Sequence, residues 1–435
     1  MKLPVDLEER YQLNDELHIH PYEPLEPPTR VLTLVMVRTD EQRADELLHL
    51  KRLSAKRGVE IETSGLTSRL SCDDFLLKVE SHQDFTRYKF IARPDPDNLA
   101  HPCTGDPLAS PPLSLLPQGW LEALPGKLLL ALDLMILPYP VNETHAGLMR
   151  HYACCFDPST LCASQIGRSK SLVLTDFRIG ENRFSRMLLF SRAKMPTQLG
   201  RLAYRLIDIE TYRMLAMRIL SPARGLRKQL PKADRELNAL TTAISGGSGL
   251  SDEQLLERLT TLAAKIEAMV SAHYRPFSLA SARFELVRQR LDELYEQPVG
   301  PQSTLGRFLR RRLNRARSTA ESAFEWLEQL AGRIAQASQL LRTRIDVHNE
   351  KQNRNLLAAM NRRFQLQLRL QQAAEMMTVA IFTYYGTNVL DYVYQEISKE
   401  SGATPDSLLF KSIAAPALAI AAVWFVYRIR KKRQE

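Results

Sequence analysis

A long part of the second half of the chain contains no proline, since none occurs between Pro301 and Pro405. Proline interrupts the hydrogen bonding of a helix interior, so a stretch without it can form an unusually long helix. Apolar residues recur there every three or four positions, as in a packed or coiled-coil helix. The series is Leu327, Leu330, Ile334, Ala337, Leu341 and Ile345. A helix over residues 304–372 would reach about 100 Å. We therefore expect a stalk helix over residues 301–375, with Gly332 as a candidate point of interruption.

The first part of the chain has the short β-branched and aromatic runs of a sheet. Residues 30–37 (RVLTLVMV) predict a buried strand. A helix is expected from about residue 41 to residue 56, with Gly58 as its C-terminal cap. The further runs that predict strands are residues 59–63, 75–79, 85–91, 127–137, 171–177 and 184–190. Together they indicate a mostly antiparallel α+β domain over residues 1–194.

A change to helical periodicity follows, and it predicts a helical domain over residues 195–300. Pro196 suits the first position of a helix. Ser251 with Gln254 three residues later is the pattern of a capping box, which predicts a second helix start. The expected helices after the first one cover residues 231–244, 251–273 and 278–296.

Two segments near the end of the chain have the length of transmembrane helices. Residues 408–427 are strongly apolar and are followed by RIRKKR, a basic flank typical of the cytoplasmic side. Residues 376–397 are less apolar but long enough. The flanks predict an outer loop at 398–407 and a basic cytoplasmic tail at 428–435. The expected fold class is thus an α+β N-terminal domain, then a long helical bundle or stalk and two C-terminal transmembrane helices, with both termini cytoplasmic.

A polar stripe marks the first of these two segments. Its members follow steps of four, three and four, which places them on one helical face. They are Tyr384, Asn388, Asp391 and Gln395. Such a stripe is expected to face protein or water rather than lipid. Two interpretations remain open, namely hydrogen bonding between neighbouring helices and the lining of a pore.

The formal net charge is +10, and arginines crowd the start of the predicted stalk. The candidate basic patch consists of Arg307, Arg310, Arg311, Arg312 and Arg315. It suits anionic lipid or a partner chain. Stacking aromatics are not interleaved with the arginines, so no nucleic acid is expected as a partner.

The sequence gives only weak signals for catalytic or metal-binding residues. His18 and His20 are candidate metal ligands, with a structural role in a proline-rich arm as the alternative. The five cysteines form no CxxC pair, which indicates a reducing compartment rather than a zinc site or a disulfide framework. Phosphate-binding loops and hydrolase motifs are missing from the sequence. We expect a protein that is not an enzyme and has no cofactor, with a divalent cation as a candidate ligand.

Several longer motifs resemble a bacterial family of membrane-anchored proteins catalogued as domain of unknown function family 3422. They are LNDELHIHP (residues 13–21), HQDFTRYKF (82–90), TDFRI (175–179), GRLAYRLIDIETYRM (200–214), LLRTRIDV (340–347) and MNRRFQLQLRLQ (360–371). The resemblance implies a membrane-anchored bacterial protein, and with the two predicted spans we expect a two-pass protein of the bacterial inner membrane. It implies no activity and no functional residues.

The order of predicted elements also resembles CorA-type magnesium channels, which have an α/β domain, a long stalk helix, two membrane helices and a basic tail. The Gly-Met-Asn of those channels is matched only in part by Gly386-Thr387-Asn388. Two hypotheses follow. One is a homo-oligomeric, CorA-like cation channel or transporter. The other is a membrane-tethered scaffold that does not transport and whose cytoplasmic domain binds protein or lipid partners. Both expect membrane lipids and further copies of the chain, in a symmetric oligomer, as partners.

Overall fold

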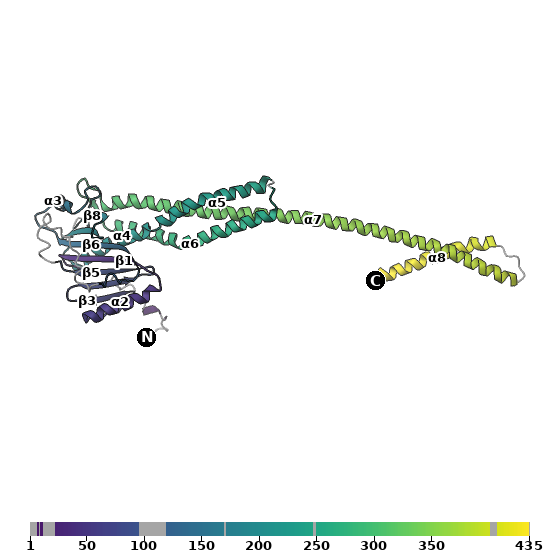
Figure 1. Ribbon diagram of the computed structural model, residues 1–435, viewed down its shortest axis with the longest axis horizontal. Coiled ribbons are helices and arrows are strands. Elements are labelled where there is room, and N and C mark those ends of the chain that lie inside the picture. Colours follow the sequence, from purple (N-terminus) through teal and green to yellow (C-terminus); the bar gives the residue numbers. More distant parts are fainter. Residues whose placement is uncertain are drawn as a thin grey trace, which may run out of the picture. The chain divides into compact units, whose positions relative to one another are not determined.

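The computed structural model describes residues 7, 9–11, 22–94, 119–168, 171–246, 249–400 and 407–434 (Figure 1). The chain divides into two compact units, Met1–Ala337 and Ser338–Glu435. The first unit contains a sheet and a helical bundle. The second unit is a helical hairpin.

The sheet of the first unit has ten strands in the order β10-β7-β8-β9-β6-β1-β5-β4-β3-β2. The strands are β1 (Thr29–Val37), β2 (Glu62–Ser64), β3 (Thr67–Ser71), β4 (Leu76–Ser81), β5 (Phe85–Ala92), β6 (Lys127–Pro138), β7 (Cys162–Ile166), β8 (Ser171–Ile179), β9 (Ser185–Ser191) and β10 (Gln297–Pro298). Neighbouring strands are antiparallel except for β6 and β9, which are parallel. The α+β domain predicted from the sequence is confirmed.

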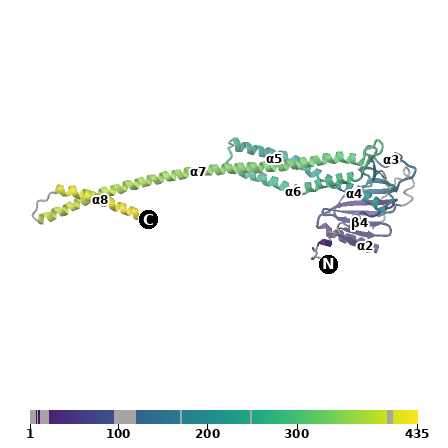
Figure 2. The ribbon, with the colours of Figure 1, turned by 180° about the vertical axis from the view of Figure 1, so that it is seen from behind.

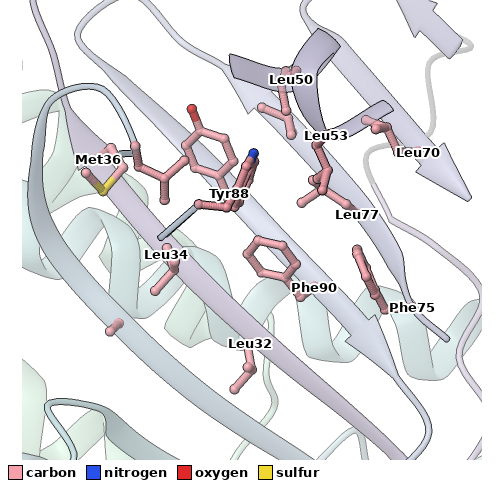
Figure 3. Close-up of a cluster of buried hydrophobic side chains, with 14 of the residues drawn as sticks. Leu32, Leu34, Met36, Leu50, Leu53, Leu70, Phe75, Leu77, Tyr88 and Phe90 are labelled. Carbon is pink, nitrogen blue, oxygen red and sulfur yellow. The ribbon is translucent and has the colours of Figure 1, made fainter. Parts of the chain in front are cut away.

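One face of this sheet carries the apolar core under helix α2 (Gln42–Arg57). Successive strand residues point to opposite faces, so every second residue of β1 enters the core. Figure 3 shows Leu32, Leu34 and Met36 of β1 beside Tyr88 and Phe90 of β5. Leu50 and Leu53 of α2 close the cluster from above the sheet. The helix ends as predicted, because Gly58 takes the left-handed conformation at φ 69° and donates its N–H to the Ser54 carbonyl.

Short helices cover the other half of the sheet. Helix α3 (His145–Tyr152) is preceded by the N-cap residue Thr144, whose hydroxyl accepts a hydrogen bond from the Gly147 N–H. A 3-10 turn, η3 (Ala153–Cys155), follows it. Leu148 and Met149 of α3 pack on apolar residues of β6, β8 and β9, which form a second core cluster.

The helical bundle of the first unit consists of α4 (Pro196–Met217), α5 (Leu220–Gly246), α6 (Asp252–Asp292) and the first part of α7 (Leu305–Glu400). Helices α5 and α6 lie beside α7 in both views (Figure 1, Figure 2). Steps of four and three place one buried apolar row of α7 against them. The row is Leu309, Leu313, Ala316, Ala320, Ala323, Leu327, Leu330 and Ile334.

Several local predictions for these helices are confirmed, and others are wrong. Pro196 occupies the start of α4, and the capping box of Ser251 and Gln254 opens α6. Helix α5 begins eleven residues before Pro231, and α6 continues through Pro276. Packing of both helices in the bundle outweighs the hydrogen bond that each proline removes. Helix α7 also runs through Gly332 without a break.

The second unit pairs the last part of α7 with α8 (Ser407–Gln434). The rings of Tyr394 in α7 and Phe410 in α8 stack with centroids 4.3 Å apart. The expected outer loop at 398–407 lies largely outside the described residues, as do the side chains of 429–435 in the expected tail.

The prediction of two transmembrane helices is wrong. In the part of the chain that the structure describes, none of the helices combines the length and the apolar character that crossing a bilayer requires. In the first segment, Asn388, Asp391 and Gln395 interrupt the apolar sequence. In the second, Lys411 interrupts the apolar sequence. Two further expectations depended on these spans, namely a two-pass protein of the bacterial inner membrane and ion transport across that membrane. Both are corrected together with the spans.

Candidate functional site

Charged side chains occupy the face of the sheet that lies opposite the α2 core. On β4 and β5 they alternate with the apolar core residues, so they point toward helix α4. Tyr204, Asp208 and Tyr212 of α4 are spaced by four and share the face that meets them. We call the following set the charge cluster. It comprises Lys78, Glu80, Arg87, Lys89, Tyr204, Asp208, Tyr212 and Arg290, the last from α6.

Arg87 is the centre of the charge cluster and has no solvent exposure (0%). Its Nη1 donates to Asp208 Oδ1 at 2.8 Å and to Glu80 Oε2 at 3.2 Å. Arg290 holds the other oxygen of Asp208, with Nε 3.2 Å from Oδ2. Lys89 pairs with Glu80 beside them. The cluster therefore connects the sheet to α4 and α6.

Two tyrosine rings complete the surroundings of Arg87. The guanidinium carbon lies 5.6 Å from the centroid of the Tyr204 ring and 5.8 Å from that of Tyr212. Nε and Nη2 of Arg87 have no hydrogen-bond partner among the described residues. The aromatic faces are the groups that stabilise this part of the cation, because a buried guanidinium is attracted to a ring quadrupole.

Burial shifts the pKa values of the cluster. It raises the pKa of the Asp208 carboxyl, against the effect of Arg87 and Arg290. It lowers the pKa of Lys89 to about 8, with Glu80 acting in the opposite direction. Burial also acts to raise the pKa of Glu80, but Lys89 and Arg87 keep that pKa below its ordinary value. At the edge of the cluster, burial and then Arg87 lower the pKa of His82 to about 4.

Perturbed pKa values of this kind are frequent at active sites, but the space beside the cluster is small. The adjoining cavity, which Lys89 and Tyr204 line, holds about 20 Å³. That volume suits a water molecule and excludes a metabolite. The cluster is therefore suited to fixing α4 and α6 on the sheet. Arg283 of α6 adds a second link, with Nη2 2.6 Å from an oxygen of Asp84.

Sequence reasoning had not singled out the residues of the charge cluster. Two of the quoted motifs contain most of it, since HQDFTRYKF carries Arg87 and Lys89 and GRLAYRLIDIETYRM carries Tyr204, Asp208 and Tyr212. The available signal was the presence of charges at inward-facing positions of a strand and of an apolar helix. Such charges need partners inside the fold.

The four residues of the predicted polar stripe take two different positions in the hairpin. Asp391 is only 6% exposed, and Lys411 Nζ of α8 lies 2.9 Å from its Oδ2. Gln395 Nε2 donates to the same oxygen at 3.0 Å. Tyr384 and Asn388 instead line a groove between α7 and α8. Their role as pore-lining residues stays a prediction.

Grooves with mainly apolar linings occur at two places on the hairpin. One has a volume of about 970 Å³, and small residues such as Ala380, Ala415 and Ala419 form part of its lining. Another has a volume of about 500 Å³ and includes Ile381, Phe382 and Leu418. Large apolar side chains stand exposed along the hairpin. Examples are Met376, Met377, Ile381, Phe382, Val389, Ile413, Ile420, Val423, Trp424 and Phe425.

The predicted basic patch lies on α7 in the first unit. Arg307, Arg311 and Arg315 are exposed, while Arg310 Nη2 lies 2.6 Å from Asp292 Oδ1. Arg312 covers the ring of Phe308, with its guanidinium carbon 3.6 Å from the centroid. As to metals, His18 and His20 lie outside the described residues, and no group of three or more candidate ligands occurs within them.

The fold defines a class of protein in which a mixed sheet domain and a helical bundle are followed by a helical hairpin. The chain belongs to the family described as protein of unknown function (DUF3422), whose profile matches residues 6–433. This confirms the family that the motifs indicated. A search of curated proteins gave no match. The architectural resemblance to CorA-type channels is not supported.

Proposed function

We propose that this protein is a self-associating scaffold without enzymatic activity. In this proposal, the hairpin formed by Ser338–Glu435 joins copies of the chain, and the body formed by Met1–Ala337 binds a partner. The observation that supports it best is the apolar surface of the hairpin, where large side chains from Met376 to Phe425 stand exposed. Apolar surface of this extent marks an interaction site.

A second copy of the hairpin is the occupant that we propose for the grooves. The larger groove is lined in part by small residues, and apolar side chains such as Ile381 and Phe382 stand exposed elsewhere on the hairpin. Ridges of one helix pack into grooves of another when small and large residues alternate in this way. The same surface therefore carries both complementary shapes, which favours a closed symmetric assembly.

The proposal is tested by measuring the mass of the full-length protein by analytical ultracentrifugation over a range of concentrations. We expect an oligomer. The paired change Ala419→Lys with Val423→Lys places two charges in the larger groove and should yield smaller species. The matched control is Gln365→Lys with Gln367→Lys, which adds the same charge at exposed polar positions of the same unit. A monomeric wild-type protein, or an unchanged oligomer in the groove variant, contradicts the proposal.

A further inference from the structure

Three exposed arginines of α7 have no carboxylate partner among the described residues. They are Arg307, Arg311 and Arg315, and their spacing of four places them on one face. Each guanidinium presents a fork of N–H donors that matches a carboxylate. This row therefore offers positive charge and directed donors that no carboxylate of the described residues uses.

The position of the row on its helix does not stabilise the helix. Helix α7 begins at Leu305 and has no acidic residue in its first turn. Cations near a helix N-terminus oppose the helix dipole, and like charges four residues apart repel each other. The helix start is stabilised separately by Glu296, whose Oε2 accepts the Gly306 N–H at 2.9 Å. An anion outside the body of the chain would relieve this repulsion.

A cleft of about 200 Å³ lies between α6 and α7, along the stretch of α7 from Arg310 to Arg317 that overlaps the row. Its base is apolar, formed by Phe284, Val287, Leu291 and Leu313, and Arg288, Arg310, Asn314 and Arg317 stand at its rim. Two of these arginines pair with exposed carboxylates, namely Arg310 with Asp292 at 2.6 Å and Arg317 with Glu321 at 2.7 Å. Exposed pairs of this kind contribute little and exchange readily for a better partner.

From the row and the cleft together, we infer that the body binds an acidic helical segment of a partner protein. One apolar side chain of that segment enters the cleft, and carboxylates spaced by four residues meet Arg307, Arg311 and Arg315. Nucleic acid is disfavoured because the neighbouring aromatic ring, Phe308, is covered by Arg312 and stacks on Phe177 at 5.1 Å. Stacking on open aromatic faces is the main way in which single strands are held. This inference rests on the scaffold function proposed above, since it names the partner that the body binds.

The test uses the full-length protein and a short labelled helical peptide that carries Leu and Glu at helical spacing, with binding followed by fluorescence anisotropy. We expect binding that weakens as salt is raised. The triple change of Arg307, Arg311 and Arg315 to Gln should lower the affinity about tenfold or more. The matched control changes Arg224, Arg227 and Lys228 of α5 to Gln, which removes the same charge from another exposed helix of the body. It should change the affinity by less than about twofold.

Further arms of the experiment separate the alternatives. Asn314→Trp covers the cleft from an exposed position and should weaken binding of the Leu-containing peptide while circular dichroism stays unchanged. The inference is overturned if the peptide does not bind or if the triple variant binds as well as wild type. It is also overturned if a single-stranded oligonucleotide or vesicles of anionic lipid bind more tightly than the peptide. Oligomer mass is measured on the same samples. If the protein is monomeric but still binds the peptide, the proposed self-association is wrong and the inferred peptide site is not affected.

Discussion

Arg87 of β5 and Asp208 of α4, which are 121 positions apart in the sequence, form a buried ion pair with Nη1 and Oδ1 2.8 Å apart. Asp208 also meets Arg290 of α6, so one carboxylate holds cations from a strand and from a second helix. A buried pair of this kind gives little net stability, but the loss of one partner leaves an uncompensated charge inside the protein. This asymmetry makes the pair suitable for testing how the helices are held on the sheet.

Arg87→Met should lower the free energy of unfolding of the protein by about 3–5 kcal/mol, because Asp208 and Glu80 lose their shared buried cation. Urea denaturation followed by circular dichroism measures the change. The double variant Arg87→Met with Asp208→Leu should recover part of the loss, since it also removes the buried carboxylate that would keep only the partly exposed Arg290 as its ion-pair partner among the described residues. A single variant as stable as wild type would show that the pair does not hold the helices.

Stability should also fall when the pH is lowered from about 6.5 to about 4, in part through His82. Burial and Arg87 lower the pKa of His82 to about 4 in the folded protein. Between that pKa and the ordinary value of about 6.5, the unfolded chain binds a proton that the folded protein does not. The imidazole is partly in contact with solvent, so we expect a contribution of about 1–2 kcal/mol.

The measurement compares the pH dependence of unfolding in wild type and in His82→Gln. Carboxylates titrate in both proteins, so the difference between the two curves isolates the histidine. His273→Gln, a change away from the charge cluster, is the control. Parallel curves for wild type and His82→Gln would argue against a neutral buried imidazole in the folded protein.

Gly200→Ala should destabilise the protein by more than about 2 kcal/mol, although alanine normally favours a helix. A Cβ at this position of α4 would lie 1.8 Å from the carbonyl oxygen of Glu23. Gly225→Ala in α5 meets nothing within 4 Å and should stabilise the protein by about 0.5–1 kcal/mol. Thermal unfolding of the two variants should therefore shift in opposite directions. Shifts of the same sign would contradict the close approach of the chain at Gly200.

Lys411→Met should loosen the hairpin of the second unit, because buried Asp391 then keeps, among the described residues, only the hydrogen bond from Gln395. Hydrogen exchange read by mass spectrometry should become faster in α8 and in the adjoining part of α7. Lys411→Arg retains the charge and should exchange more slowly than the methionine variant. Equal exchange in the two variants would show that the ion pair does not hold the hairpin closed.

Alkylation by iodoacetamide at pH 8 should modify Cys154 well before Cys162. Cys154 is exposed, whereas Cys162 is buried in β7, and burial raises the pKa of its thiol to about 12. The thiolate is the reactive form, so the buried cysteine should react only as the protein unfolds. Peptide mapping over time gives both rates. Comparable rates would mean that β7 opens readily in the folded state.

Local features of this chain were predictable because their physical causes lie within a few residues. Gly58 ends α2 since glycine tolerates the left-handed conformation there, and Ser251 with Gln254 opens α6 through its own side-chain hydrogen bonds. Prolines were less informative. Pro276 lies inside α6, because packing along the bundle compensates for one lost hydrogen bond.

By itself, therefore, the sequence determined the α+β character of the first part, the long helix after Pro301 and the family. The partners of its inward-facing charges depended on the tertiary structure. The motif that holds Arg87 shows a charge in a strand, and the motif that holds Asp208 shows a charge in a helix, but neither indicates that they meet. The prediction of two transmembrane helices was wrong for a related reason. Asp391 and Lys411 interrupt the two apolar segments, and only the fold shows that these two charges meet as an ion pair.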